Sequence, residues 1–314
     1  MTEPMAVSQH FIAWQCSIAL NNQYLYYWFQ TKKCEFERIA IGNTIKTIGL
    51  SYFNALKTPV PSVPEQNAIV AALSDADALI SGLDQFIAKK RDLKQAAMQQ
   101  FLTGQTRLPG FHGNWEEKIL SDFGSTYGGL TGKTKADFAD GNGRYVTFLN
   151  VMNNVVIDHD IFDCVKISPN ESQNRVIKGD LLFNGSSETP EEVAMCSVIT
   201  AEAPFLFLNS FCFGFRFRSD ADADGLFLAY YLRSKVGREL MKSLAQGSTR
   251  YNISKGAFLK SKLRMPSRPE QSAIASVLSD MDTELAALEA RRDKAIALKQ
   301  GMMQELLTGR IRLV

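Results

Sequence analysis

The chain has 314 residues, of which 45% are hydrophobic and 22% charged, as expected of a protein that buries a core. This composition excludes a disordered chain, a collagen and a small disulfide-stabilised scaffold. The 35 lysines and arginines against 33 aspartates and glutamates leave a net charge of +2. The charge of the whole chain therefore neither requires nor excludes a nucleic-acid partner.

The five cysteines are scattered, without a CxxC pair or another metal-ligand spacing. This pattern favours free thiols in a reducing compartment over a zinc site or disulfides. Residues 1–16 lack the basic segment and apolar run of a signal peptide, and no apolar stretch is long enough to cross a membrane. We therefore expect a cytoplasmic protein with no metal site and no membrane partner.

Residues 1–60 are similar to the end of a segment that comes later in the chain. GNTIKTIGLSYFNALKTP (42–59) aligns with GSTRYNISKGAFLKSKLR (247–264), and Tyr26-Tyr27 aligns near Tyr230-Tyr231 with a shift of one residue. We interpret residues 1–60 as the C-terminal remnant of a first globular domain.

Residues 61–108 are repeated at 266–313 with 23 identities in 48 positions and no gap, which indicates an internal duplication. Each copy predicts a long helix that begins near proline 64 or 269 and ends at glycine 104 or 309. Apolar residues at alternating steps of four and three predict an antiparallel coiled coil between the two copies. Ordinary core helices are the alternative, because the seam drifts after Ile87. The predicted pairing residues are Ile69, Leu73, Ile80, Leu83, Ile274, Leu278, Leu285 and Leu288.

Residues 109–265 predict a complete globular domain in which strands dominate, so the fold class is α+β. Strands are expected at 146–151 and 180–184, and one or two helices over 225–246. Phenylalanines on alternate positions of 205–217 predict a half-buried strand or a bent pair of strands, interrupted near Asn209-Ser210. These rings could stack on bases, but a core face is the better interpretation because few basic residues surround them in the sequence.

The sequence GGLTGKT (128–134) resembles a phosphate-binding loop, but Tyr127 occupies the position of the required first glycine. A polar, glycine-rich loop that carries Lys133 and Lys135 is the better description. The chain has no nucleophile elbow, no HExxH and no dinucleotide fingerprint. Asp158-His159-Asp160 predicts exposed turn residues, since adjacent side chains do not converge on one ion. We expect no catalytic centre and no cofactor.

The segment from Lys242 to Pro269 carries seven basic residues and no acidic one. It includes GSTRYN (247–252), whose side chains suit hydrogen bonds to phosphates or base edges. A solvated basic face is the alternative on charge alone.

The repeated PxxPEQxAI, the SDxD of the helix and the LTGxxRL ending resemble the conserved regions of type I restriction–modification specificity subunits. The intervening segment fits too, with WEEKILSDFG, a GxTxK loop, KGDLLF and GSTxxxIS. The resemblance implies mixed α/β target-recognition domains joined by the two long helices. It also implies four parts: a remnant of the first recognition domain (1–60), a first helix (61–108), a complete second recognition domain (109–265) and a second helix (266–314).

The resemblance implies a non-catalytic subunit that binds double-stranded DNA, reads part of a bipartite target and docks methyltransferase subunits on its helices. An endonuclease/translocase subunit joins the complex for cleavage. This chain departs from the family pattern because residues 1–60 match only the C-terminal part of a recognition domain. A shortened chain, a recombination cassette or a half-subunit that self-dimerises would each explain the departure. The alternative function is a helical assembly scaffold without independent DNA recognition. The DNA-contact candidates are Lys133, Lys135, Asn184, Ser186, Thr249, Arg250, Tyr251, Asn252 and Lys255.

Overall fold

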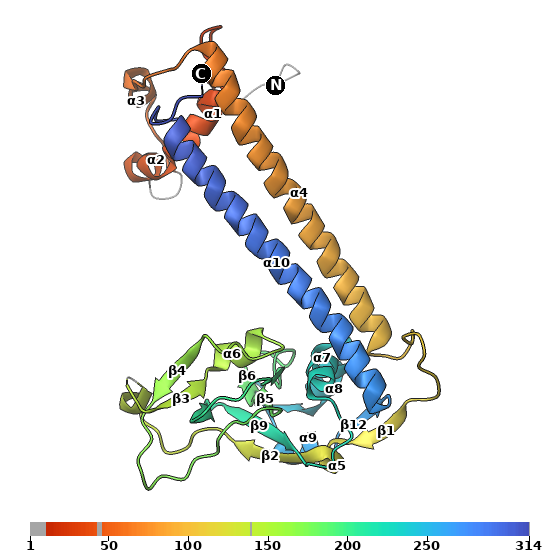
Figure 1. The fold of residues 1–314 in the computed structure, drawn as a ribbon. Coiled ribbons are helices and arrows are strands. Elements are labelled where there is room, and N and C mark those ends of the chain that lie inside the picture. Colours follow the sequence, from red (N-terminus) through yellow and green to blue (C-terminus); the bar gives the residue numbers. More distant parts are fainter. Residues whose placement is uncertain (1–10, 43–45, 139, 314) are drawn as a thin grey trace. The chain divides into compact units, whose positions relative to one another are not determined.

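The computed structural model describes residues 11–42, 46–138 and 140–313. The chain divides into two units, one formed by 1–90 and 284–314 and the other by 91–283, which are called unit 1 and unit 2. Two long helices, α4 (Val63–Phe101) and α10 (Arg268–Leu306), contribute to both units (Figure 1). The α+β fold class is confirmed, whereas the four-part division of the chain stays a prediction.

Unit 2 contains every named strand of the described residues, in four small sheets. Their orders are β1-β12, β10-β11-β6, β2-β9-β5-β7 and β4-β3-β8. All pairings are antiparallel except that of β3 with β8. The strands are β1 (Glu116–Ile119), β2 (Gly124–Gly128), β3 (Gly143–Val146), β4 (Phe162–Val165), β5 (Leu181–Asn184), β6 (Ser186–Ser187), β7 (Cys196–Val198), β8 (Leu206–Leu208), β9 (Cys212–Phe217), β10 (Ala245–Gln246), β11 (Tyr251–Ile253) and β12 (Lys262–Met265).

Short helices join these strands, and side-chain caps explain where several begin. Residues 225–246, where the sequence predicts one or two helices, form two, and Asp224 and Ser234 accept hydrogen bonds from their first turns. Ser254 caps the helix after β11. The helices are α5 (Leu120–Phe123), η1 (Lys135–Phe138), α6 (Phe148–Asn153), α7 (Gly225–Arg233), α8 (Lys235–Leu244) and α9 (Lys255–Leu259).

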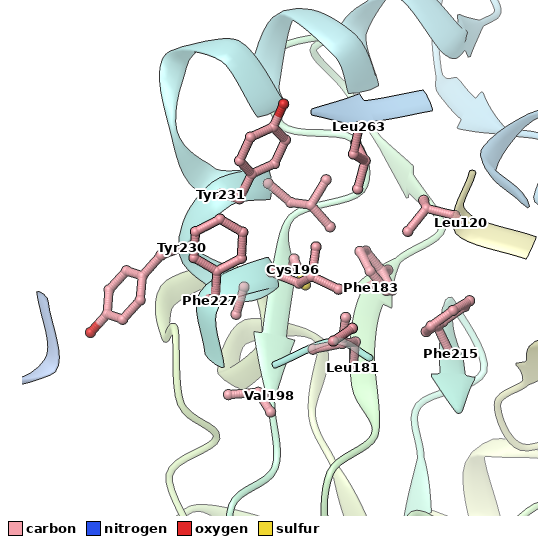
Figure 2. Close-up of a cluster of buried hydrophobic side chains, with 14 of the residues drawn as sticks. Leu120, Leu181, Phe183, Cys196, Val198, Phe215, Phe227, Tyr230, Tyr231 and Leu263 are labelled. Carbon is pink, nitrogen blue, oxygen red and sulfur yellow. The ribbon is translucent and has the colours of Figure 1, made fainter. Parts of the chain in front are cut away.

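The main core of unit 2 lies between the β2-β9-β5-β7 sheet and helices α7 and α9. Figure 2 shows Phe183, Phe215 and Phe227 among its buried side chains. Phe258 of α9 is fully buried, and its ring lies 4.9 Å from that of Phe183 and 6.0 Å from that of Phe215. Because α9 anchors its core face through Phe258, the polar residues at its start are held at a fixed place on the sheet.

Unit 1 contains α1 (Asn22–Thr31), α2 (Lys33–Ile39) and α3 (Leu50–Ala55), together with most of α4 and of α10. Its core joins α1 to the start of α4 and the end of α10 through Trp28, Ile69, Leu73 and Leu306. The start of α4 therefore lies beside the end of α10, so the two helices are antiparallel.

Ion pairs follow the same antiparallel register in each unit. In unit 1, Lys90 lies 2.6 Å from Glu284, Arg292 lies 3.7 Å from Asp84, and Lys299 pairs with Asp77. In unit 2, Lys94 pairs with Asp282. The two residue numbers of each pair add up to nearly the same value, as an antiparallel register requires.

The duplication seen in the sequence is repeated in the contacts. Lys299 pairs with Asp77 and faces the Tyr27 ring, while Lys94 pairs with Asp282 and faces the Tyr230 ring. The tyrosine hydroxyls donate to the same aspartates at 2.8 and 2.6 Å.

The two helices also begin alike. Gln66 and Gln271 each donate to the carbonyl of the proline five residues earlier, at 2.9 and 2.8 Å. The two halves are thus built by one set of side-chain interactions, used twice.

The strand predicted at 146–151 is wrong. β3 ends at Val146, and α6 begins at Phe148 because the Thr147 hydroxyl accepts a 3.2 Å hydrogen bond from the amide of Asn150. A threonine cap favours a helix start even where the following residues are apolar. The strand predicted at 180–184 is confirmed as β5, and the interruption at Asn209-Ser210 separates β8 from β9.

Candidate nucleic-acid interface

Arg250 lies at the centre of a polar cluster on the β10-β11-β6 sheet of unit 2. Its Nε donates to the Ser186 hydroxyl at 3.2 Å, and its guanidinium lies 5.6 Å from the centre of the Phe211 ring. Phe211 is 59% exposed, and its carbonyl accepts a 2.8 Å hydrogen bond from Gly185. Arg250 is exposed and pairs with no carboxylate of the described residues. Its charge is therefore available to a ligand.

Strand pairing brings two more predicted residues to this cluster. Tyr251 and Asn252 of β11 lie opposite Ser187 and Ser186 of β6. Thr249 and Asn252 are exposed, and Tyr251 is half-buried. We name the surface formed by Ser186, Phe211, Thr249, Arg250, Tyr251, Asn252 and Lys255 the polar edge.

Asn184 is a buried residue that supports the polar edge. Its side chain is fully buried, donates to the carbonyls of Ser186 at 3.1 Å and Glu192 at 2.9 Å, and accepts from the amide of Met195 at 2.6 Å. Because these bonds use both donors of the buried amide, Asn184 shapes the turn that presents Ser186 and has no donor left for a ligand.

The start of the glycine-rich loop packs against the same place. The amide of Gly129 donates to the carbonyl of Cys212 at 3.2 Å, and a Cβ on Gly129 would lie 2.0 Å from the Asn209 carbonyl oxygen. Only glycine fits there. A Cβ on Gly128 would lie 3.6 Å from Nζ of Lys255, so the first residues of the loop border the polar edge.

The two lysines of that loop lie in its distal part. Lys133 donates to Glu171 at 2.5 Å and to the carbonyl of Lys166 at 2.6 Å, and its side chain is 5% exposed. The Lys133 ammonium, with a hydrogen bond from Gln173, lowers the pKa of Glu171 to about 2. Lys133 therefore attaches the loop to the segment that contains Lys166 and Glu171. Lys135, in contrast, is exposed at the start of η1.

The phenylalanine series of 205–217 is only partly a core face. Phe207, Phe213 and Phe215 are buried, as predicted, but Phe205 and Phe211 are 50% and 59% exposed. Phe205 precedes β8 and Phe211 lies between the turn at Asn209-Ser210 and β9, so both residues are outside the ladders. In the fold, arginines that are distant in the sequence lie next to the Phe205 and Phe211 rings.

Three exposed arginines of unit 2 lie over aromatic rings. The guanidinium of Arg175 lies 4.6 Å from the Phe205 ring centre, and that of Arg144 lies 5.4 Å from Phe162. The third is Arg250, described above. Phe205 also has a positive φ of 52°, which is rare for a bulky side chain and is maintained only where the surroundings impose it. Sequence reasoning missed these pairs because their partners are distant in the chain.

An ion pair between the partly exposed Arg216 and the buried Asp180, near the glycine-rich loop, has a structural role. Arg216 binds both carboxylate oxygens of Asp180 at 2.9 and 2.7 Å, and the Tyr127 hydroxyl donates to Asp180 at 2.6 Å. Burial raises the pKa of Tyr127, and the Asp180 carboxylate adds to that effect. The three side chains connect β2 and β9 to the turn before β5. Both oxygens of the Asp180 carboxylate accept hydrogen bonds in this contact.

Most of the predicted helix-pairing residues are buried, and their pairing as a coiled-coil seam stays a prediction. Ile69, Leu73, Leu83, Ile274, Leu278 and Leu285 are buried, and Ile80 and Leu288 are half-buried. Lys90 and Lys94, where the apolar seam drifts, instead make ion pairs to α10.

Among the described residues, no three His, Cys, Asp or Glu side chains lie close enough to hold a metal ion. Burial raises the pKa of the Cys212 thiol to about 12, so this thiol stays protonated. No described helix is both long enough and apolar enough to cross a membrane.

The sequence matches the family model of the type I restriction modification DNA specificity domain over residues 1–89 and 112–298. The chain belongs to this family. It is 24% identical over 307 residues to the type I restriction enzyme MjaVIII specificity subunit of Methanocaldococcus jannaschii, covering 93% of this chain and 71% of that protein.

Solved structures share the fold. A type I restriction–modification S subunit from M. genitalium matches with a TM-score of 0.59 and 18% identity, over 92% of this chain and 73% of that one. A chain from a structure of type I restriction–modification complex assembly matches with a TM-score of 0.53 and 14% identity, over 93% and 72%.

Proposed function

We propose that this chain is the DNA-reading subunit of a type I restriction–modification complex, and that the polar edge of unit 2 reads a half-site of a bipartite target. The exposed Arg250, stacked on Phe211 and bonded to Ser186, carries the proposal. A guanidinium fixed in this way can make bidentate bonds to guanine or phosphate without losing much side-chain entropy. Lys255, Thr249 and Asn252 add contacts to phosphates and base edges.

The arrangement requires no chemistry from this chain. The Asp180 carboxylate is bound by Arg216 and Tyr127, and the Cys212 thiol stays protonated, so neither group is available as a base or nucleophile. Modification and cleavage then belong to a methyltransferase subunit and an endonuclease/translocase subunit. We propose that the charged outer faces of α4 and α10 dock the methyltransferase subunits, and that the assembly works in the cytoplasm.

Within this proposal, residues 109–265 form the recognition domain and residues 61–108 and 266–314 form the helical spacer. Residues 1–60 correspond to the end of a first recognition domain. A second domain, from a self-dimer or another chain, would supply the other half-site.

The test measures the affinity for duplex DNA of the chain purified with its methyltransferase subunit, by fluorescence anisotropy over a range of salt concentrations. Selected duplexes should bind with a steep salt dependence, because each neutralised phosphate contributes about 0.9 to the slope of log K against log salt. Arg250→Ala should weaken specific binding roughly tenfold or more, since one good base contact is worth about 1–3 kcal/mol.

Arg218→Ala is the matched control, because Arg218 is an exposed arginine of unit 2 that pairs with Asp220 at 3.5 Å. It should leave specific binding unchanged. A well-folded complex that binds the methyltransferase but no duplex would instead support the alternative function, a helical assembly scaffold.

A further inference from the structure

Gly104 and Gly309 occupy the same position in the two repeats, at the ends of α4 and α10, but their surroundings differ. Both have left-handed backbones, with φ of 71° and 73°. A Cβ on Gly104 would lie 3.1 Å from the Trp115 ring, whereas a Cβ on Gly309 would meet nothing within 4 Å. The Trp115 ring therefore covers Gly104, whereas no described side chain covers Gly309 in the same way.

The strand that carries this tryptophan also lacks a counterpart in unit 1. In unit 2, β1 follows Trp115 and pairs with β12 over Glu116–Ile119 and Lys262–Met265. The residues that correspond to β12 in the duplication are 57–60, and they belong to no strand of the described residues. An extended segment that pairs with these residues, called the 57–60 edge, would supply the missing counterpart of the β1-β12 ladder.

The buried glutamates of the two repeats show a third difference. Arg107 pairs with Glu270 and also binds the carbonyls of His112 and Gly113, which precede Trp115. Arg312 pairs with Glu65, and the described residues provide it with no such carbonyls. The side chain of Arg107 is 24% exposed and that of Arg312 is 60% exposed. Arg312 thus has donors available where Arg107 binds the incoming chain.

Unit 1 has a cavity of about 590 Å³ at this place. Its lining includes the 57–60 edge, Leu306 and Gly309, with Arg312 at its border. Leu306 and Leu307 belong to the adjoining core, so a ring placed in the cavity would contact apolar groups. Trp14 of unit 1 does not fill it, because Trp14 is 46% exposed and packs on Phe29 and Phe53.

We propose that this cavity is a docking site for an extended segment of the type of residues 111–119, from a polypeptide outside residues 11–313. Its tryptophan would pack on Gly309, the carbonyls before it would bind Arg312, and its strand would pair with residues 57–60. The proposal rests on the duplicated contacts and does not depend on DNA recognition. Pro59 removes one backbone donor from the edge, so the tryptophan provides much of the specificity.

A second copy of this chain is a less suitable occupant. Its own residues 116–119 are paired with β12, and its Trp115 is 9% exposed against Gly104. To donate this segment, the second copy would have to open its own core. The occupant is therefore the front strand of another recognition domain.

The test uses a fluorescein-labelled peptide of residues 110–121, GFHGNWEEKILS, titrated with the full chain and followed by anisotropy. The peptide should bind saturably, and the same peptide with Trp115→Ala should bind at least tenfold more weakly. Gly309→Asn should weaken binding to a similar extent, because asparagine tolerates a positive φ and its side chain would occupy the place of the ring. Gly132→Asn is the matched control, with φ of 67° and open space around its Cβ position.

Hydrogen exchange on the unmodified chain gives a second measurement that does not depend on any variant folding. Peptide should protect the amides of 57–60 and leave those of 262–265 unchanged. Equal binding of the tryptophan and alanine peptides, or protection at 262–265 instead, would overturn the proposal. Protection of 57–60 in a self-associated chain that the peptide fails to dissociate would also overturn it, because a second copy would then be the occupant.

Discussion

Truncation of Phe258 to alanine should destabilise unit 2 by about 4 kcal/mol. Phe→Ala in a core costs about 3–5 kcal/mol, and Phe258 falls in the upper part of this range because it is fully buried. Its ring also makes edge contacts with Phe183, Phe213 and Phe215 at centroid distances of 4.9, 5.5 and 6.0 Å. Each such pair adds to the value of buried area alone.

The duplication provides a matched control. Phe53 of α3 corresponds to Phe258 of α9, but it is half-buried and contacts Phe29, Phe36 and Tyr52 at 6.4, 5.8 and 5.6 Å. With less area removed from water, Phe53→Ala should cost about 1–2 kcal/mol.

Urea denaturation followed by a probe in unit 2 distinguishes the two changes. In a chain with Trp14→Phe and Trp28→Phe, the remaining Trp115 belongs to the same core as Phe258 and reports on unit 2. Phe258→Ala should lower the free energy of unfolding by about 4 kcal/mol, while Phe53→Ala should leave the Trp115 transition nearly unchanged. A loss under about 1.5 kcal/mol for Phe258→Ala, or equal losses for the two variants, would refute the packing described here.

Three further changes test other parts of the structure. Leu73→Ala and Leu278→Ala each remove a fully buried side chain at equivalent helix positions, so thermal unfolding should show similar losses of about 3 kcal/mol, and a negligible loss for either would contradict the paired helices. Arg233→Met should cost about 3 kcal/mol in urea unfolding, because Arg233 binds several carbonyls that would be left unpaired, and an unchanged midpoint would contradict this role. The pKa of Glu171 is lowered to about 2, so the stabilising Lys133 contact should be complete above about pH 4.5 and lost as the pH falls toward 2. An NMR titration of the Glu171 carboxyl with a midpoint near 4.5 would contradict that pairing.

The repeat of residues 61–108 at 266–313 was the main basis for predicting the two long helices. Identical residues 205 positions apart located both long helices to within three residues, and the heptad spacing indicated that they pair. The antiparallel register could not be read from the seam beyond Ile87. There Lys90 and Lys94 replace apolar contacts with ion pairs to Glu284 and Asp282, which only the partner helix reveals.

The candidate site was predicted less completely. The β11–β6 pairing places Asn252 opposite Ser186, and Arg250 bonds to the same serine, but their contact with DNA stays a prediction. Phe211 was missed, since its exposure depends on the turn at Asn209-Ser210 and its arginine lies 39 positions later in the sequence. Asn184 is among the predicted DNA contacts, but its buried amide bonds to the turn that it supports.

Sequencing of methylated DNA tests the central claim most directly. A host that carries this chain with its methyltransferase subunit should show modification at one defined sequence motif, and Arg250→Ala should abolish or relax one part of that motif while Arg218→Ala leaves it intact. The same motif with and without Arg250, or no motif from a complex that assembles and folds, would contradict the account of unit 2 as the part that reads DNA.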